Sequence, residues 1–162
     1  MTAPIIRKGH PKDLPALLAL IQELAAYEHA ADQVEITLET LEKEGFGDTP
    51  LFYFLVAEID GQVVGTALYF HTYSTWKGRV LYLEDLVVQQ SFRRLGIGKL
   101  LFDGLVQEAQ QLDAKRLCWQ VLDWNTPAIQ FYKKIQTNFD SEWINCKLTA
   151  TQIQNYSSTH GA

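Results

Sequence analysis

The sequence has few cysteines and no apolar run long enough to cross a bilayer. Cys118 and Cys146 are the two cysteines among 162 residues, and neither has a CxxC partner or a histidine at ligand spacing. We therefore expect no zinc site and no disulfide framework, and free thiols are typical of the reducing cytosol. Residues Met1 to Lys12 lack an apolar signal core, so neither export nor membrane insertion is predicted.

Positive charge is also scarce. The chain has 14 Lys and Arg residues against 19 Asp and Glu residues, which gives a formal net charge of -5. Non-specific nucleic-acid binding needs a basic surface, so that class of protein is disfavoured. The chain does have 47% hydrophobic and 20% charged residues. This composition is typical of one globular domain with a buried core and excludes a disordered chain.

The spacing of apolar residues predicts strands and helices up to position 148. Helices are expected at 14–25, 38–45, 97–112 and from 126, and strands at 5–7, 52–59, 63–73, 79–88, 116–122 and 142–148. Asp60-Gly61 favours a tight hairpin turn between two of the strands. The strand–helix–strand unit at 79–122 requires a parallel, right-handed crossover. We therefore expect an α/β (α+β) fold with a mixed, mostly antiparallel sheet.

Local signals also predict where helices begin and where the domain ends. Thr37 and Thr126 are the expected N-caps of two helices, and Pro127 then takes the first helical position. Residues 1–148 form the expected single domain. Residues 149–162 turn polar and lose their periodicity, so they are expected to be a loose tail or a segment that a partner orders.

The segment after the 79–88 strand is the one that suggests chemistry. Gly96 and Gly98 allow a tight turn and a close approach of the backbone to a ligand. The helix that begins there offers unpaired N–H groups and the positive end of its dipole, which suit phosphate oxygens. Arg93, Arg94 and Lys99 add positive charge at the same place.

Specific residues exclude two common nucleotide loops. A Walker A loop needs a hydroxyl residue after its lysine, but Leu100 follows Lys99. A dinucleotide fingerprint needs a third glycine where Leu101 stands. The remaining pattern, Arg-x-x-Gly-x-Gly between a strand and a helix, resembles the pyrophosphate loop of the GNAT superfamily of acetyl-CoA-dependent N-acetyltransferases. Taken alone, this short pattern fits an ordinary glycine-bearing turn equally well.

Longer stretches extend the resemblance over nearly the whole chain. The chain resembles the diamine (spermidine/spermine) acetyltransferase branch of that superfamily, and within it the thialysine N-acetyltransferase type. The matching stretches include Glu23-Leu24-Ala25, Tyr27-Glu28, Tyr82-Leu83-Glu84-Asp85, Phe131-Tyr132-Lys133, and, closest to the thialysine type, Tyr73 to Arg79 and Val121 to Asn125. The resemblance implies the GNAT fold with helices on both faces of the sheet, acetyl-CoA as cosubstrate, no metal, and a homodimer.

The resemblance also implies roles for individual residues. Glu84 matches the residue that helps to remove the proton of the acceptor amine, and Tyr132 matches the proton donor to the departing thiolate. The residues implied to bind acetyl-CoA are Leu86, Val87, Val88, Arg93, Arg94, Gly96, Ile97, Gly98, Lys99, Asn125 and Tyr132. Those implied to bind the acceptor are Glu28, Trp76, Glu84, Asp85 and Trp143, with Glu28 coming from the partner subunit.

Each role has a structural alternative. Two adjacent acids are costly to bury, so Glu84 and Asp85 also fit an exposed strand edge or a salt bridge. Tyr132 and the two tryptophans also fit a core, Asn125 fits a turn, and Glu28 fits a solvated helix end.

Two positions depart from the pattern of the branch. Ser74 stands where the polyamine enzymes have an acid, and this loss weakens attraction for a multiply charged polyamine. Gln136 stands where the family usually has a glycine, so the turn after that helix must differ.

The sequence thus predicts a cytosolic enzyme that acetylates a small primary amine by direct attack. The alternatives are a catalytically weak CoA-binding sensor or assembly module, and an acetyltransferase of protein or peptide amines.

Overall fold

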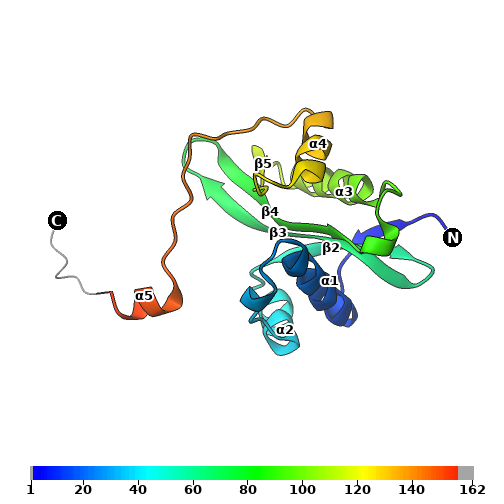
Figure 1. Cartoon of the computed structure of the whole chain (residues 1–162), viewed down its shortest axis with the longest axis horizontal. Helices are drawn as coiled ribbons and strands as arrows, with labels where there is room; N and C mark the ends of the chain where they lie inside the picture. The colour runs from blue at the N-terminus through cyan, green and yellow to red at the C-terminus, as the bar shows by residue number, and fades with distance from the viewer. Residues whose placement is uncertain (1, 157–162) are drawn as a thin grey trace. The chain divides into compact units, whose positions relative to one another are not determined.

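Five strands form one sheet in the order β1-β2-β3-β4-β5 (Figure 1). Their bounds are β1 Ile5–Lys8, β2 Tyr53–Ile59, β3 Gln62–Ser74, β4 Gly78–Val88 and β5 Arg116–Cys118. The first four strands pair antiparallel, and β5 pairs with β4 in parallel. This computed structural model, which describes residues 2–156, therefore confirms the mixed, mostly antiparallel sheet.

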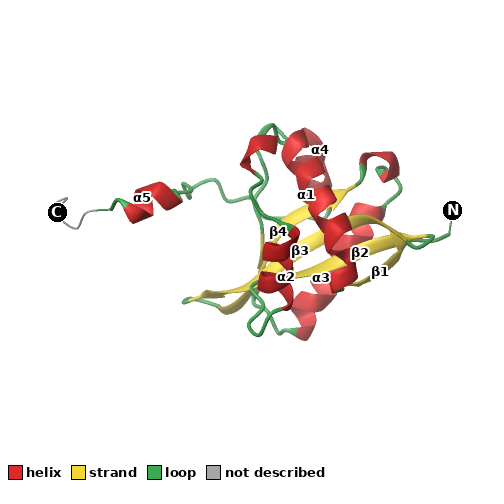
Figure 2. Ribbon diagram, turned by 90° about the horizontal axis from the view of Figure 1, so that it is seen from below, coloured by secondary structure: helices red, strands yellow, loops and turns green. Residues whose placement is uncertain are grey.

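Helices cover both faces of the sheet, as the resemblance implies. α1 (Leu14–Tyr27) and α2 (Leu38–Phe46) lie on one face, and α3 (Ile97–Gln111) lies on the other (Figures 1 and 2). The hydroxyl of Thr37 accepts the N–H of Thr40 at 3.2 Å, which confirms the predicted cap of α2. Asp60 and Gly61 have φ angles of 49° and 80° in the β2–β3 turn, where the sequence predicts a hairpin.

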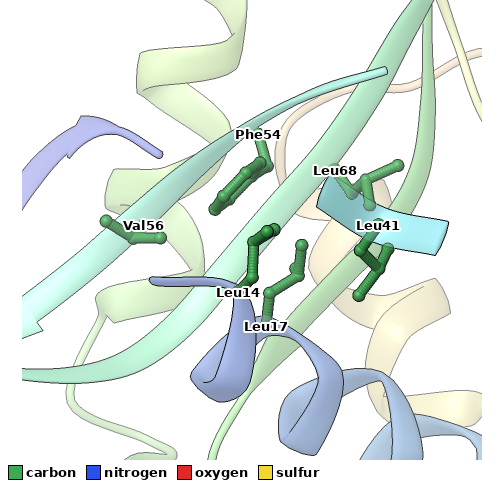
Figure 3. Close-up of a cluster of buried hydrophobic side chains, with 6 residues drawn as sticks. All are labelled: Leu14, Leu17, Leu41, Phe54, Val56 and Leu68. Atoms are coloured by element: carbon green, nitrogen blue, oxygen red, sulfur yellow. The ribbon is translucent and has the colours of Figure 1, made fainter. Parts of the chain in front are cut away.

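Apolar side chains hold α1 against the sheet. Figure 3 shows a buried cluster built from two helices and two strands, with the members Leu14, Leu17, Leu41, Phe54, Val56 and Leu68. Leu17 and Val56 have no exposed surface. Burying one such side chain contributes about 1.5–3 kcal/mol relative to leaving it exposed, so this cluster fixes the position of α1 strongly.

Residues 1–120 and 121–162 form two compact units, and all five strands belong to the first. The second unit contains α4 (Thr126–Lys134) and α5 (Ala150–Gln154). The expected domain boundary at position 148 stays a prediction. Within residues 2–156 no helix is both long and apolar enough to cross a membrane.

The prediction of a final strand at 142–148 is wrong. These residues form neither strand nor helix, and Trp143 and Ile144 are 73% and 88% exposed. A strand needs a neighbouring edge to pair its backbone groups, and an apolar pattern alone does not provide that edge. In the segment expected to be loose, Ala150–Gln154 is helical and is capped by Thr149. The remainder of that tail, 157–162, lies outside the described residues.

Two smaller differences concern the neighbouring elements. β5 ends at Cys118 instead of continuing to position 122. The N-cap of α4 is Asn125, not Thr126, because the Asn125 side chain accepts the N–H of Ala128 at 3.3 Å. Asparagine is a good cap for the same reason as threonine, since both offer a short side-chain oxygen.

Candidate active site

The sheet opens between β4 and β5. The parallel ladder joins Val80, Leu81 and Tyr82 to β5 and extends no further. On its other edge β4 stays paired with β3 as far as Val88. The backbone of residues 83–88 therefore has one edge outside the β5 ladder. That edge includes Leu86, Val87 and Val88, which the resemblance implies bind acetyl-CoA.

β4 carries an extra residue at this opening. Leu68 of β3 pairs with Asp85, and the next residue, Tyr69, pairs with Leu83, so Glu84 is a β-bulge. Bulges bend a strand and redirect side chains, and they are common beside active sites. Directly opposite residues share a face of the sheet, so Asp85 lies on the same face as Leu68, which is the face covered by α1. Glu84 is exposed, whereas Asp85 is partly buried.

Asp85 lies in an acidic environment. Burial, together with the negative charges of Glu84 and Glu28, raises the pKa of Asp85 to about 6. Burial also raises the pKa of Glu28, which caps the end of α1. The resemblance implies that Glu28 comes from the partner subunit, but its charge also acts on Asp85 within one chain. Carboxyl groups tuned in this way can attract a cation and accept its proton.

The glycine loop has the geometry of an anion cradle. Gly96 is the N-cap of α3 and has a left-handed φ of 78°, and Arg94 has a φ of 64°. A Cβ at Gly96 would meet no atom within 4 Å, and one at Gly98 would meet only Val88, at 3.9 Å. No side chain of residues 2–156 caps α3 at Gly96. The first N–H groups of α3, including those of Ile97 and Gly98, therefore suit the diphosphate of acetyl-CoA.

The three predicted cations of this loop have different surroundings. Lys99 is half exposed and pairs with Asp103 one turn along α3. Arg94 is exposed on the loop. Arg93, in contrast, donates from Nε to the Val88 carbonyl oxygen at 2.9 Å and lies 3.4 Å from the Glu23 carboxylate. The predicted phosphate contact of Arg93 would compete with these contacts inside the protein.

The second unit carries Asn125, Tyr132 and Trp143. Tyr132 lies on α4 and is 6% exposed, so its ring is buried. Asn125 caps α4 through its side-chain oxygen, which gives it a structural role. The roles of these residues toward acetyl-CoA and the acceptor stay predictions.

Neither tryptophan predicted to bind the acceptor is buried. Trp76 lies in the β3–β4 turn and is 77% exposed, and Trp143 is 73% exposed. Asp85 stands seven residues along β4 from Gly78, which corresponds to roughly 23 Å of extended strand. One chain therefore does not bring Trp76 to the acidic group, and the core alternative is wrong for both tryptophans.

Sequence reasoning missed Glu23 and Tyr27, which contact the loop from α1. Glu23 accepts the backbone N–H of Gln90 at 2.8 Å, and the Tyr27 ring centroid lies 5.2 Å from the guanidinium of Arg93. The only sequence signal was that both residues lie in stretches that match the branch.

An aromatic cavity of about 240 Å³ lies at a different place in the first unit. Its lining is made by Lys8, Gly9, Gly45, Phe46, Phe52, Tyr53, Phe54, Tyr69, His71 and Glu108, and it includes no predicted site residue. Three of its polar groups pair with one another, because Glu108 accepts from Tyr69 at 3.1 Å and from Lys8 at 3.1 Å.

Residues 16–136 match the family described as the acetyltransferase (GNAT) family. The chain is 42% identical over 143 residues to a thialysine N-epsilon-acetyltransferase of Bos taurus, which covers 83% of this chain and 84% of the relative. It is also 42% identical over 134 residues to spermidine/spermine N(1)-acetyltransferase-like protein 1 of Homo sapiens, and this match covers 78% of this chain but 19% of that longer protein.

Solved structures share the fold at lower identity. An integron cassette protein from the mobile metagenome of V. cholerae superposes with a TM-score of 0.78 at 23% identity, covering 95% of this chain and 97% of that one. An aminoglycoside acetyltransferase from an uncultured soil metagenomic sample gives a TM-score of 0.75 at 22% identity, covering 90% and 95%. The comparisons and the sheet topology together confirm the predicted fold.

Proposed function

From the premise that this chain belongs to the GNAT acetyltransferase family, we propose that its acceptor is a small primary amine of the thialysine or lysine type. The chain is an acetyltransferase, and its family uses acetyl-CoA as the acetyl donor. Relatives that are 38–42% identical carry the name thialysine N-epsilon-acetyltransferase. The observation that supports this acceptor most directly is the acidic group that Glu84 and Asp85, on the bulged part of β4, form with Glu28 at the end of α1.

The acidic group suits the two demands that an amine acceptor makes. An alkyl amine has a pKa of about 10.4, so it arrives as an ammonium ion without a lone pair. Asp85 and Glu28 hold the cation, and Glu84 removes its proton, in keeping with the resemblance. Acetyl-CoA supplies an activated acetyl thioester, held by the glycine loop and by the β4 backbone at residues 86–88. Tyr132 returns a proton to the thiolate.

Two conservative variants test these roles. Glu84→Gln and Tyr132→Phe should each lower kcat by about 10²-fold or more, because each removes a proton-transfer group. Both should leave the Kd for CoA nearly unchanged in calorimetry. Unchanged turnover in both variants would contradict the assignments. Tight CoA binding by the wild type without acetylation of any amine in a broad panel would favour the alternative of a CoA-binding sensor.

Ser74 supports a small acceptor over a polyamine through the proposed dimer, because within one chain the β3–β4 turn lies away from the acidic group. Its side-chain oxygen accepts the N–H groups of Trp76 and Lys77 at 3.3 and 3.2 Å, so it closes the β3–β4 turn without adding negative charge. We expect lysine analogues to outcompete spermidine when both amines are supplied together. Ser74→Asp should improve kcat/KM for spermidine relative to the lysine analogue. If the wild type prefers spermidine, the argument from Ser74 is wrong.

A homodimer and a cytosolic location complete the proposal. Tyr73 and Trp76, on the β3–β4 hairpin, are 73% and 77% exposed in one chain. Exposed aromatic side chains of this size are typical of protein interfaces. Light scattering of the purified protein should give twice the chain mass, and Trp76→Ser should weaken that dimer. The free thiols of Cys118 and Cys146 suit a reducing compartment.

A further inference from the structure

Arg93 joins three parts of the first unit. Its Nε donates to the carbonyl oxygen of Val88 at 2.9 Å, at the end of β4. One terminal nitrogen lies 3.4 Å from the Glu23 carboxylate of α1. The guanidinium also lies over the ring of Tyr27, one turn further along α1. A planar guanidinium can satisfy a hydrogen bond, an ion pair and an aromatic contact at the same time.

Glu23 makes a second connection to the same segment. Its Oε1 atom accepts the backbone N–H of Gln90 at 2.8 Å, across 67 residues of sequence. Gln90 begins the short 3-10 turn Gln90–Phe92 that leads into the glycine loop. Glu23 and Tyr27 stand four residues apart and therefore share a face of α1. That face of α1 thus contacts the segment between β4 and the glycine loop through both Gln90 and Arg93.

We propose that Glu23 and Arg93 are positioning residues that hold the end of α1 against the segment leading into the glycine loop. α1 ends beside Glu28, whose charge acts on Asp85. The two residues therefore set the acidic group relative to the loop that holds acetyl-CoA. This inference rests on the proposed function for its catalytic consequence. It also gives Arg93 a role other than the predicted phosphate contact.

The exposure of the pair suits this role better than one in stability. The side chains of Arg93 and Glu23 are 37% and 31% exposed, and an exposed ion pair stabilises a fold very little. Alignment, in contrast, responds to small displacements, because a shift of about 1 Å can cost a large factor in rate. The expected signature is therefore a loss of turnover with little change in unfolding.

Steady-state kinetics with acetyl-CoA and a lysine analogue test the proposal. Glu23→Ala and Arg93→Gln should each lower kcat/KM for the amine by about tenfold, with the KM for acetyl-CoA changed by less than about twofold. The double variant should be no worse than either single variant, because the two side chains act as one unit. Additive losses, or an unchanged Glu23→Ala variant, would overturn the proposal.

Conservative variants separate positioning from phosphate binding. Arg93→Lys keeps the charge but loses the fork that reaches Val88 and Glu23 together, so it should resemble Arg93→Gln. Glu23→Gln keeps an oxygen for the Gln90 N–H and should restore part of the rate lost in Glu23→Ala. A wild-type rate in Arg93→Lys, with a raised KM for acetyl-CoA in Arg93→Gln, would assign Arg93 to phosphate instead. Glu42→Gln and Lys12→Gln, at exposed positions on other elements, serve as charge controls.

Hydrogen exchange of the substrate-free protein tests the contacts without any assay of activity. Glu23→Ala and Arg93→Gln should increase amide exchange about tenfold in residues 24–28 and 90–93, and not in α3. Unchanged exchange in both segments would overturn the proposal even if the variants were inactive. Faster exchange together with a wild type that acetylates no amine would instead overturn the proposed function and keep the connection.

Discussion

Two carboxyl groups differ in their surroundings: Asp13 lies at the start of α1, and Asp85, on β4, is influenced by Glu28 at the end of α1. Their pKa values are shifted in opposite directions. At the start, Asp13 is 5% exposed and accepts two hydrogen bonds from Arg7, at 2.7 and 2.9 Å. The Arg7 guanidinium and the N–H of His10 hold the pKa of Asp13 below its usual range. At the other end, burial and two neighbouring carboxylates raise the pKa of Asp85 to about 6.

The difference separates a structural charge from a functional one. Arg7 also pairs with Glu58 at 2.7 Å, so Asp13 belongs to a compensated network that ties β1, β2 and α1 together. The charged groups that act on Asp85 are themselves acids, and these like charges make the ionised form costly. Carboxylates without a basic partner are more typical of a site that binds a cationic ligand.

The largest loss of stability is expected from a substitution that breaks the ion-pair network at the start of α1. Asp13→Asn should lower the free energy of unfolding by about 2–3 kcal/mol, because it leaves the Arg7 guanidinium without its main partner. Urea unfolding at neutral pH measures this loss, and kcat at a temperature well below the transition should stay unchanged. Asp113→Asn removes a carboxylate from an exposed pair with Lys115 and should leave the unfolding curve in place. Equal losses in both variants would contradict the distinction.

Substitution of Asp85, near the other end of α1, should change the free energy of unfolding in the opposite direction. Asp85→Asn should raise the free energy of unfolding at pH 7.5 by about 2 kcal/mol, because it removes a carboxylate whose ionisation burial opposes. The same variant should lower kcat/KM for the amine by at least about tenfold, since a cation-binding charge is lost. The stability gain should vanish near pH 3, where the carboxyl is protonated in the folded and unfolded states. A less stable Asp85→Asn variant at pH 7.5 would contradict the assignment.

The pH dependence of the free energy of unfolding should also distinguish Asp13 from Asp85. The folded pKa of Asp13 is lowered, so its stabilisation is complete above the ordinary value and is lost as the pH falls through the folded value. The folded pKa of Asp85 is raised, so its contribution favours the folded state at low pH and declines as the pH rises from about 4 to about 6. Unfolding measured from pH 3 to 8 should show both slopes, and Asp85→Asn should remove only the second. An acid limb of kcat/KM near pH 6 should disappear in that variant.

The smallest expected effect concerns the glycine loop that Arg93 and Glu23 connect to α1. Gly96→Ala should cost roughly 1 kcal/mol of stability, because a φ of 78° strains any residue with a Cβ. Gly61→Ala is a matched control, since Gly61 has a φ of 80° and also has no atom near its Cβ position. Both variants should unfold at similar urea concentrations, and only Gly96→Ala should weaken CoA binding in calorimetry. Equal CoA affinity in the two variants would contradict the cradle.

Local signals predicted the central elements well. The hairpin at Asp60-Gly61 and the cap at Thr37 depend on residues only a few positions apart, so sequence spacing was sufficient. The strand predicted at 142–148 failed because a strand depends on a partner edge that sequence spacing does not contain. The glycine loop was predictable for the first reason, since Gly96 acts through its own φ angle.

The candidate site was predictable only in its residue types. The adjacent acids of β4 were visible in the sequence, but the bulge at Glu84 and the approach of Glu28 come from strand register and helix packing. The phosphate role predicted for Arg93 followed from its place beside two glycines. Its contacts with Glu23 and Tyr27, about 70 residues away in the sequence, could not follow from that place.

Spacing alone predicted the order of strands and helices as far as α4, the Asp60-Gly61 turn and the position of the glycine loop, because backbone geometry and apolar periodicity act over a few residues. The assignment of charges is a property of the folded chain. Arg7 reaches Asp13 and Glu58, Arg93 reaches Glu23, and Asp85 meets only like charge among the groups that shift its pKa. Electrostatic energies depend on distance and burial, and both arise only when distant segments pack together.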